Sequence, residues 1–265
     1  MPWKRSAPGR TEASRRDTIA GMRPSLKHAL LVSLLLAGTS CRGDAMDASK
    51  AFPDPAAAAL ADAAARGDAD AVRDAIQQGS DPDARGDRGV NALQFAMLAQ
   101  NKTGLRALLA AGADPNAPGL GGATAVHSAS IADDPEYLEI VLEGGGDPDA
   151  RHGESGRVPL ADAAGPRTDA QFHMLLDAGA DPNLADRTGN TPLHTAALVN
   201  AGAHVLALLE AGASPHAKNA QDATFQRYFF KLPTAKLSDD ARAERERVIA
   251  WLRGENVPLE AGAGG

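Results

Sequence analysis

The stretch Asn190-Thr-Pro-Leu-His-Thr-Ala-Ala197 combines the signals that begin a short buried helix. Thr191 can cap a helix N-terminus, and Pro192 suits the first helical turn because its missing N–H would have no partner there. We expect Leu193 to be buried, and the two alanines allow a second helix to approach closely. We expect His194 to hydrogen-bond locally and to tie this turn to its neighbour. The stretch therefore predicts a tightly packed helix that begins at a turn.

A second phrase recurs along the chain at a nearly fixed interval. Asp followed by Pro and then by Asn or Asp occurs at Asp81, Asp114, Asp147 and Asp181, and Ser214-Pro continues the series. The intervals are 33, 33, 34 and 33 residues. Each later phrase follows an apolar pair and a small turn, as in Leu208-Leu-Glu-Ala-Gly-Ala213. Regular self-similarity of this length indicates stacked units rather than one globular core.

The small turn before each phrase contains a glycine at a constant position: Gly112, Gly145, Gly179 and Gly212. We expect each glycine to end a helix in the left-handed conformation. The proline that follows prevents the helix from continuing. One unit cannot bury its own apolar face, so the units must stack.

These motifs resemble the ankyrin repeat family over residues 56–217, with a divergent last unit to about 261. The resemblance implies an all-α solenoid of paired antiparallel helices with β-hairpin or turn fingers. It assigns repeats to 56–86, 87–119, 120–152, 153–185 and 186–218, and a capping unit to 219–261. His127 occupies the same landmark as His194, so we expect both histidines to be structural rather than catalytic.

The N-terminal region is typical of an exported protein. We interpret residues 1–21 as an extension upstream of the true start at Met22, and residues 22–41 as a signal peptide whose apolar run of nine residues is too short to span a bilayer. Its end, Gly38-Thr-Ser-Cys41, resembles a bacterial lipobox, although Gly38 stands where Leu is preferred. Cys41 is therefore the predicted lipidation site; ordinary cleavage near Ser40 and a retained anchor helix are the alternatives.

Residues 42–55 are polar, contain proline and show no periodicity, which predicts a flexible tether. With Cys41 lipidated, we expect a membrane-anchored protein that faces the periplasm of a Gram-negative bacterium. Because Cys41 is the single cysteine, the chain can form neither an intramolecular disulfide nor a cysteine-based zinc cluster.

Charge excludes one large class of partners. The formal net charge is −7, and residues 41–265 carry 20 basic and 32 acidic side chains, a net charge of −12. An acidic body is a poor match to a phosphate backbone or to anionic lipid, so nucleic-acid binding is not expected.

The motifs that mark common enzymes are missing from the sequence: it has no Gly-rich phosphate loop after a strand, no Gly-x-Ser-x-Gly and no His-Glu-x-x-His. We therefore expect no enzymatic activity, no cofactor and no metal. One alternative concerns the other histidines of the repeats. His152 and His216 lie near turn tips and His173 and His204 open second helices, so two of these could meet across neighbouring repeats and bind a metal.

A short acidic segment, Asp133-Asp-Pro-Glu136, allows two interpretations. It is expected to start a helix, with Asp134 as the cap and Pro135 at the first position. Calcium or a basic partner is the alternative.

Ankyrin repeats bind partners through a concave face of fingers and first helices, and the resemblance transfers this face to particular residues. The fingers are residues 85–90, 118–122, 151–157, 186–189 and 219–222, and the outward first-helix positions also include Ser128 and Asp162. The candidate partner-binding residues are Arg88, Gln94, Met97, Ile131, Arg157, Arg187, Thr195, Val199 and Tyr228. The aromatic residues Phe225, Tyr228, Phe229 and Phe230 either fill the end of the core or expose a binding anchor.

Together these features predict a monomeric, non-catalytic module that binds a protein partner. One specific form is an immunity factor that neutralises a secreted toxic effector before it damages the membrane. The alternative is a periplasmic scaffold or assembly factor that supports envelope or stress-defence enzymes.

Overall fold

The computed structural model describes residues 46–260. The predicted extension, the predicted signal peptide and the lipidation of Cys41 lie outside the described residues. Among the helices of residues 46–260, none is both long enough and apolar enough to cross a membrane.

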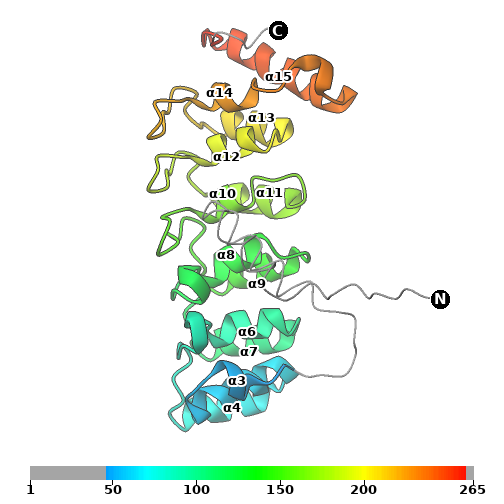
Figure 1. Cartoon of the computed structure of the whole chain (residues 1–265). Helices are drawn as coiled ribbons and strands as arrows, with labels where there is room; N and C mark the ends of the chain where they lie inside the picture. Colours follow the sequence, from blue (N-terminus) through cyan, green and yellow to red (C-terminus); the bar gives the residue numbers. More distant parts are fainter. Residues whose placement is uncertain (1–45, 261–265) are drawn as a thin grey trace, which may run out of the picture. The chain divides into compact units, whose positions relative to one another are not determined.

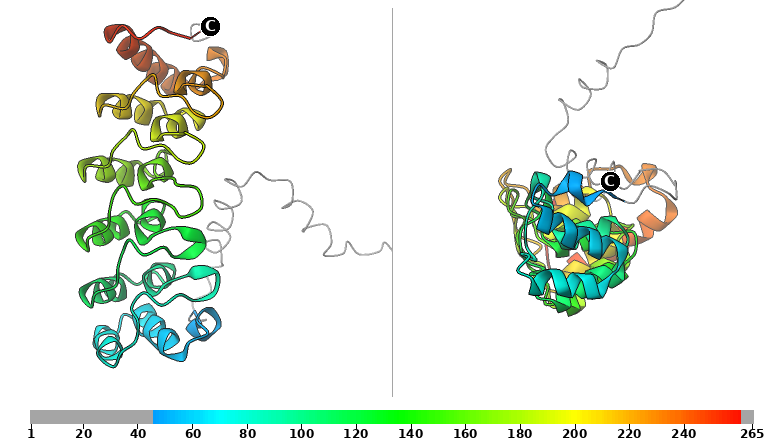
Figure 2. Two further views of the ribbon diagram at one scale, coloured as in Figure 1. Left: turned by 90° about the vertical axis from the view of Figure 1, so that its left-hand side faces the viewer. Right: turned by 90° about the horizontal axis from the view of Figure 1, so that it is seen from below.

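Helix pairs stacked in one column build the described chain (Figures 1 and 2). The pairs are α4 (Pro55–Arg66) with α5 (Ala69–Gln77), α6 (Ala92–Leu98) with α7 (Lys102–Ala110), α8 (Ala125–Ser130) with α9 (Glu136–Glu143), α10 (Pro159–Asp162) with α11 (Asp169–Asp177), α12 (Pro192–Leu198) with α13 (Gly202–Glu210), and α14 (Phe225–Phe229) with α15 (Asp239–Gly254). Each predicted repeat contains one pair, with α4 starting one residue early. The all-α solenoid is confirmed.

The fingers between the pairs are turns, because residues 46–260 contain no strand. Two fingers carry a single 3₁₀ turn, η1 (Asp87–Gly89) and η2 (Leu120–Gly122). A short backbone bond closes each neck, such as Gly119 N donating to Ala123 O at 2.7 Å. One such bond is too little for a β-ladder, so the turn form of the predicted fingers is the correct one.

The helix ends follow the predicted chemistry. Thr191 and His194 form a capping box at the start of α12, in which the Thr191 hydroxyl and His194 Nδ1 lie 2.9 Å apart. Pro192 is the first residue of that helix. The four turn glycines all have positive φ, between 86° and 99°. Only glycine adopts this conformation without strain, which explains its fixed place in every unit.

The Asp-Pro-Asn/Asp phrase forms a ladder that joins consecutive repeats. The first carboxylate of a phrase accepts a hydrogen bond from the backbone N–H two residues later. The Asn116 N–H, for example, donates to Asp114 Oδ1 at 2.8 Å. The third side chain accepts the N–H that opens the next phrase: Asp83 from Asp114, Asn116 from Asp147, Asp149 from Asp181 and Asn183 from Ser214, at 2.7–2.9 Å. The recurring polar phrase therefore satisfies backbone donors at each junction, which is why it repeats.

A second ladder runs through the first helices. His127 Nε2 lies 3.1 Å from the carbonyl oxygen of Arg157, and His194 Nε2 lies 3.0 Å from that of Ala223. These carbonyls hold equivalent places, directly before the next first helix is capped. The tie between neighbouring repeats that was predicted for His194 is thus confirmed, and His127 makes the same contact. At the equivalent position of another repeat, Gln94 makes this contact by donating to Ala123 O at 3.1 Å.

Residues 48–52 correct the predicted tether. Ala48–Ala51 form the short helix α3, capped by Asp47, and Phe52 is buried. The Phe52 ring packs edge-on against Phe95, with centroids 5.6 Å apart. A flexible tether is therefore wrong for this part of residues 42–55. The apolar ring lies against the first helix of the second repeat, and burying it there offsets the loss of chain entropy.

The capping unit contains an insertion and a long charged helix. A 3₁₀ turn, η3 (Thr234–Lys236), lies in the insertion, and Ser238 caps α15 by accepting the N–H of Ala241 at 3.2 Å. Val248 and Leu252 are buried, whereas Ile249 and Trp251 are half-buried. The buried Arg245 fastens the insertion to the helix by donating to the carbonyl oxygens of Leu232 at 2.7 Å and of Phe229 at 2.8 Å.

Candidate partner-binding surface

The fingers form one row along the same side of the column (Figure 1). Backbone bonds join neighbouring fingers: Gly153 N donates to Gly122 O, Arg187 N to Ser155 O, and Ala220 N to Thr188 O, at 2.8–2.9 Å. We call residues 85–90, 118–122, 151–157, 186–189 and 219–222 the finger row. Because four of its five fingers, from 118–122 to 219–222, are bonded to one another, these fingers present side chains from a preorganised backbone, which lowers the entropy lost on binding.

The three candidate arginines on the fingers differ in how the fold uses them. Arg88 is exposed at a tip where its φ is +57°. Arg187 is exposed, but its guanidinium donates to the carbonyl oxygens of Gly153 and Glu154 at 2.7 and 2.6 Å. Arg157 is half-buried in an ion pair with Asp162 at 2.8 Å. Among these three candidates, Arg88 is the arginine whose exposure best fits contact with a partner.

The expectation that Gln94 points outward is wrong. Its side chain is buried, donates to Ala123 O and Ser128 Oγ, and accepts the N–H of Leu120 at 2.6 Å. It stands where His127 and His194 stand in their repeats and makes the same junction contact. A Gln in a His position of a repeat was the signal that could have revealed this role.

The remaining first-helix candidates differ in how far their side chains are exposed to solvent. Met97, Ile131 and Thr195 are half-buried, whereas Val199 is 51% exposed. The neighbouring residue Leu198 is 55% exposed, although no sequence pattern marked it as a candidate. We call Leu198 and Val199 the apolar edge. Two adjacent, half-exposed aliphatic side chains at the end of α12 are suited to burial against another protein.

The aromatic cluster mainly fills the end of the core. Phe225 and Phe229 are buried. Tyr228 is half-buried, and its hydroxyl accepts from Asn219 Nδ2 at 2.7 Å and donates to Gln221 Oε1 at 2.8 Å. The core interpretation is confirmed for the two phenylalanines, and none of the four aromatic side chains is fully exposed.

The acidic segment at 133–136 starts a helix, as expected. Asp134 Oδ1 accepts the N–H of Glu136 at 3.0 Å. Lys102, from the preceding repeat, contacts both Asp134 and Glu136, and Arg106 bonds Glu136 at 2.9 Å. Hydrogen bonds from Lys102 lower the pKa of both carboxyl groups. These partners come from the fold itself, so the segment joins two repeats rather than offering a calcium site.

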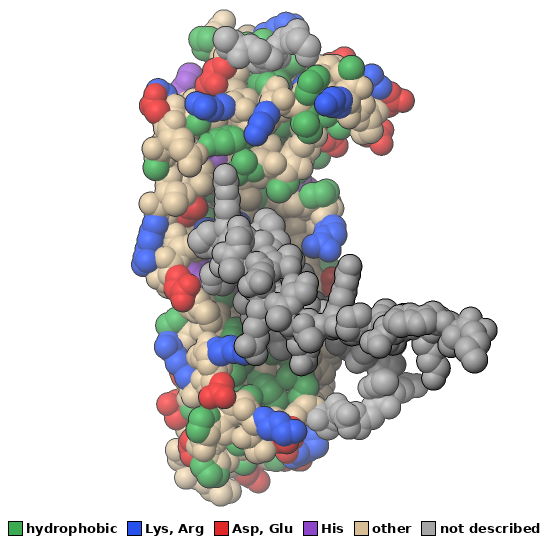
Figure 3. Space-filling view, viewed as in Figure 1, with side chains coloured by type: hydrophobic (Ala, Val, Ile, Leu, Met, Phe, Trp, Pro, Cys, Tyr) green, Lys and Arg blue, Asp and Glu red, His purple; other side chains and the backbone are tan. Residues whose placement is uncertain are grey.

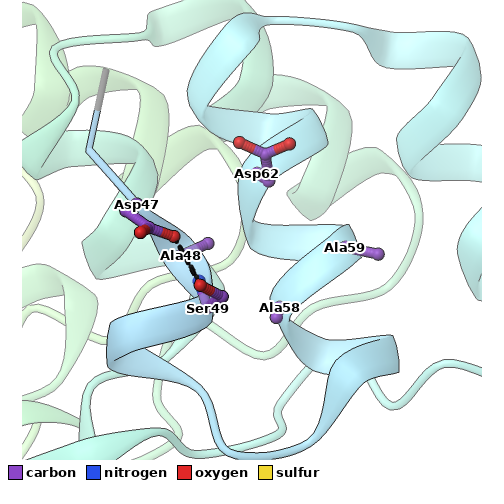
Figure 4. Close-up of a pocket in the computed structure, with 6 residues that line it drawn as sticks. All are labelled: Asp47, Ala48, Ser49, Ala58, Ala59 and Asp62. Atoms are coloured by element: carbon purple, nitrogen blue, oxygen red, sulfur yellow. Dashed lines mark hydrogen bonds between the residues drawn. The ribbon is translucent and has the colours of Figure 1, made fainter. Parts of the chain in front are cut away.

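A shallow recess lies between α3 and α4 (Figure 4). Its lining is small: Asp47, Ala48, Ser49, Ala58, Ala59 and Asp62. Asp47 accepts from the N–H and hydroxyl of Ser49 and pairs with Lys50, while Asp62 pairs with Arg66. Both carboxylates are therefore neutralised locally, and the recess brings together no acid, base or nucleophile suited to catalysis.

Charges of both signs are interspersed on the surface. Along the finger row, at the left of Figure 3, acidic and basic side chains alternate in the part of the chain that the structure describes. A continuous basic field is not seen on this part of the described surface.

The junction histidines make stability depend on pH. Burial is the main cause that lowers the pKa of His127 and of His194 below the ordinary 6.5. Below that pH the unfolded chain binds protons that the folded chain does not, so acidification destabilises the fold. Above that pH the two neutral histidines contribute their full share of the folding stability.

We predict a lower melting temperature at about pH 5.5 than at about pH 7.5. A His127→Gln/His194→Gln variant, which keeps an amide donor without a titration, should show a smaller drop; an equal drop in both proteins would contradict this.

Comparison with known proteins identifies the repeats. Residues 60–152 match the family described as ankyrin repeats (3 copies), and residues 188–220 match a further ankyrin repeat. These segments are ankyrin repeats. The helix pair between them, in residues 153–187, is matched by neither, and it includes the four-residue helix α10.

Two relatives extend the comparison. The chain is 38% identical over 144 residues to Protein PhlB of Serratia liquefaciens, and the match covers 52% of this chain and 61% of that protein. The chain thus spans about three fifths of the length of this relative. The ankyrin column also superposes on a chain in the structure of the Bd0816 predatory endopeptidase from Bdellovibrio bacteriovorus in complex with immunity protein Bd3460. That match has a TM-score of 0.56 and 23% identity and covers 70% of this chain and 97% of the other, so it shows a shared fold.

Proposed function

We propose that this protein binds a protein partner through the finger row and the apolar edge, without catalysing a reaction. The observation that carries the proposal is the exposure of Leu198 and Val199 beside a row in which four fingers are bonded to one another. Ankyrin repeats in general act as interaction modules rather than as enzymes. The fold itself uses the recurring polar side chains of the junction ladders to satisfy backbone groups.

We further propose that the protein is exported, carries a lipid on Cys41 and works at the periplasmic side of a membrane as a monomer. The basic and apolar segment followed by Gly38-Thr-Ser-Cys41 supports this part. Within this setting, the specific role we favour is an immunity factor. The structural neighbour is a chain in a complex of an endopeptidase with an immunity protein, and an exported solenoid would meet such an effector before it damages the cell.

Deletion in the native bacterium distinguishes this role from the alternative, a periplasmic scaffold for envelope or stress-defence enzymes. Loss of an immunity factor should make the strain die on contact with its own parent strain, and expression of the full chain should restore survival. Loss of a scaffold should instead give a growth defect under envelope or oxidative stress that does not depend on contact with siblings. A deletion strain that survives sibling contact would overturn the immunity role.

The apolar edge provides the matching test of the binding surface. We expect Leu198→Asp/Val199→Asp to weaken partner binding by at least ~30-fold, because burying a new carboxylate without a partner removes the anchor and adds a desolvation cost. The measurement is the amount of partner that tagged full-length protein retains from native envelopes.

The control is Ala110→Asp, which places one carboxylate at an exposed position on the second helix α7. It should retain the partner as well as the unchanged protein. Equal loss in both variants would show a general effect of charge and count against the apolar edge. Melting curves of all three proteins check that the substitutions leave the fold intact.

A further inference from the structure

Three potential metal ligands converge where two consecutive repeats meet. Asp169 is the first residue of α11, His173 lies one helical turn later, and His204 lies near the start of α13 in the next repeat. One ligand atom from each residue lies within 4.8 Å of the others. The shortest contact joins His204 Nε2 to Asp169 Oδ1 at 2.9 Å, and His173 Nδ1 lies 3.6 Å from the same oxygen. Figure 1 shows α11 and α13 in neighbouring layers.

We propose that Asp169, His173 and His204 bind a divalent transition-metal ion that fastens the repeat of α10 and α11 to the repeat of α12 and α13. Two imidazoles and one carboxylate form a ligand set that suits zinc and its neighbours rather than magnesium or calcium, which prefer oxygen ligands. Three protein ligands leave at least one position for water.

His204 is the fixed member of the set. Its side chain is 3% exposed and stacks on the Phe172 ring, with centroids 3.9 Å apart and planes 12° apart. Its Nδ1 is buried and has no hydrogen-bond partner among the described residues. Metal binding at Nε2 would leave the proton of the neutral ring on that unpaired Nδ1. Because a metal-bound histidine ordinarily donates its other N–H, we expect micromolar rather than nanomolar affinity.

The other two ligands can adjust to the ion. The side chains of Asp169 and His173 are 67% and 53% exposed. Two atoms that each lie about 2.1 Å from a zinc ion are at most about 4.2 Å apart. Rotation of these two exposed side chains can therefore complete the set while the buried ring stays in place. His173 Nδ1 donates to the carbonyl oxygen of Asp169 at 2.9 Å, which leaves its Nε2 with the lone pair that a metal needs.

A metal ion at this location would stabilise a junction that lacks the usual contact between first helices. At the junction of these repeats the place of His127, His194 and Gln94 is taken by Ala161, whose methyl group cannot donate to the next finger. The first-helix ladder is therefore interrupted at this junction. In a solenoid each interface contributes separately to stability, so a metal on the second helices would strengthen the interface that has lost its usual contact.

The test uses the full-length chain with Cys41→Ser, freed of metal by chelator, and measures Zn²⁺ binding by titration calorimetry. We expect one Zn²⁺ per chain, bound with micromolar affinity, and a melting temperature that rises with Zn²⁺. His173→Ala and Asp169→Asn should each weaken binding at least ~10-fold and remove the rise. Asp169→Asn keeps an oxygen that can accept from His204, so it changes the ligand charge with little effect on the fold.

His216→Ala is the control, because this histidine is exposed and lies outside the cluster. It should bind Zn²⁺ as the parent does. Parent protein without a 1:1 Zn²⁺ complex at tens of micromolar, or His173→Ala binding as tightly as the parent, would overturn the site. Neither measurement involves a protein partner, so failure here would leave the proposed function untouched.

Discussion

Replacing Gly104 with alanine should destabilise the protein by about 3 kcal/mol, although alanine is normally the better helix former. Gly104 lies in the first turn of α7 and is buried against α4. A methyl group at this position would lie 1.8 Å from the carbonyl oxygen of Ala64, a backbone atom that cannot rotate away. Relief of the clash requires the two helices to separate, which loosens the junction of the first two repeats. The measurement is the midpoint of chemical denaturation.

Gly254→Ala is the matched control, since Gly254 is also helical and a methyl group there would meet no heavy atom within 4 Å. It should leave stability unchanged or raise it by up to about 1 kcal/mol. Changes of opposite sign in the unfolding free energy of the two Gly→Ala variants would show that the close approach of α4 and α7 requires glycine at position 104. A stable Gly104→Ala protein would contradict the close approach of α4 and α7.

His194→Ala should cost about 2–3 kcal/mol of unfolding free energy. The buried imidazole serves the N–H and hydroxyl of Thr191 in its own turn and the Ala223 carbonyl in the next repeat. Removing it leaves these groups without their partner and opens a cavity beside Tyr228, whose ring centroid lies 6.3 Å away. Denaturation midpoints measured at neutral pH test the size of the loss.

His194→Gln should recover part of that stability, because Gln94 shows that a glutamine amide can make the same contact to the next finger. His216→Ala removes an exposed histidine and should change stability by less than about 0.5 kcal/mol. Equal effects of His194→Ala and His216→Ala would contradict the role of the ladder.

The sequence predicted the fold well because each repeat carries its own boundary signals. Thr191, Pro192 and the turn glycines report local backbone conformations, and local chemistry of this kind can be inferred without knowing the neighbours. Phe52 was missed because one aromatic residue in a polar, proline-containing segment shows no periodicity. Its burial depends on a contact with Phe95, which lies in the second repeat.

The surface was harder to predict, because exposure depends on packing between repeats. Gln94 fits an outward position in helix periodicity, yet the next repeat covers it. Leu198 was not among the candidate binding residues, yet the structure leaves it exposed. The Asp169, His173 and His204 cluster joins residues up to 35 positions apart, and the sequence suggested only that histidines of neighbouring repeats could meet.

The central claim, that the apolar edge contacts a protein partner, can be tested by site-specific photo-crosslinking in living cells. A photoreactive residue is placed at Val199 in one full-length protein and at Ala110, on the second helix α7, in another. After illumination, we predict a defined protein adduct from position 199 and none from position 110. An adduct from position 110 alone, or no adduct from either position, would contradict partner binding at this surface.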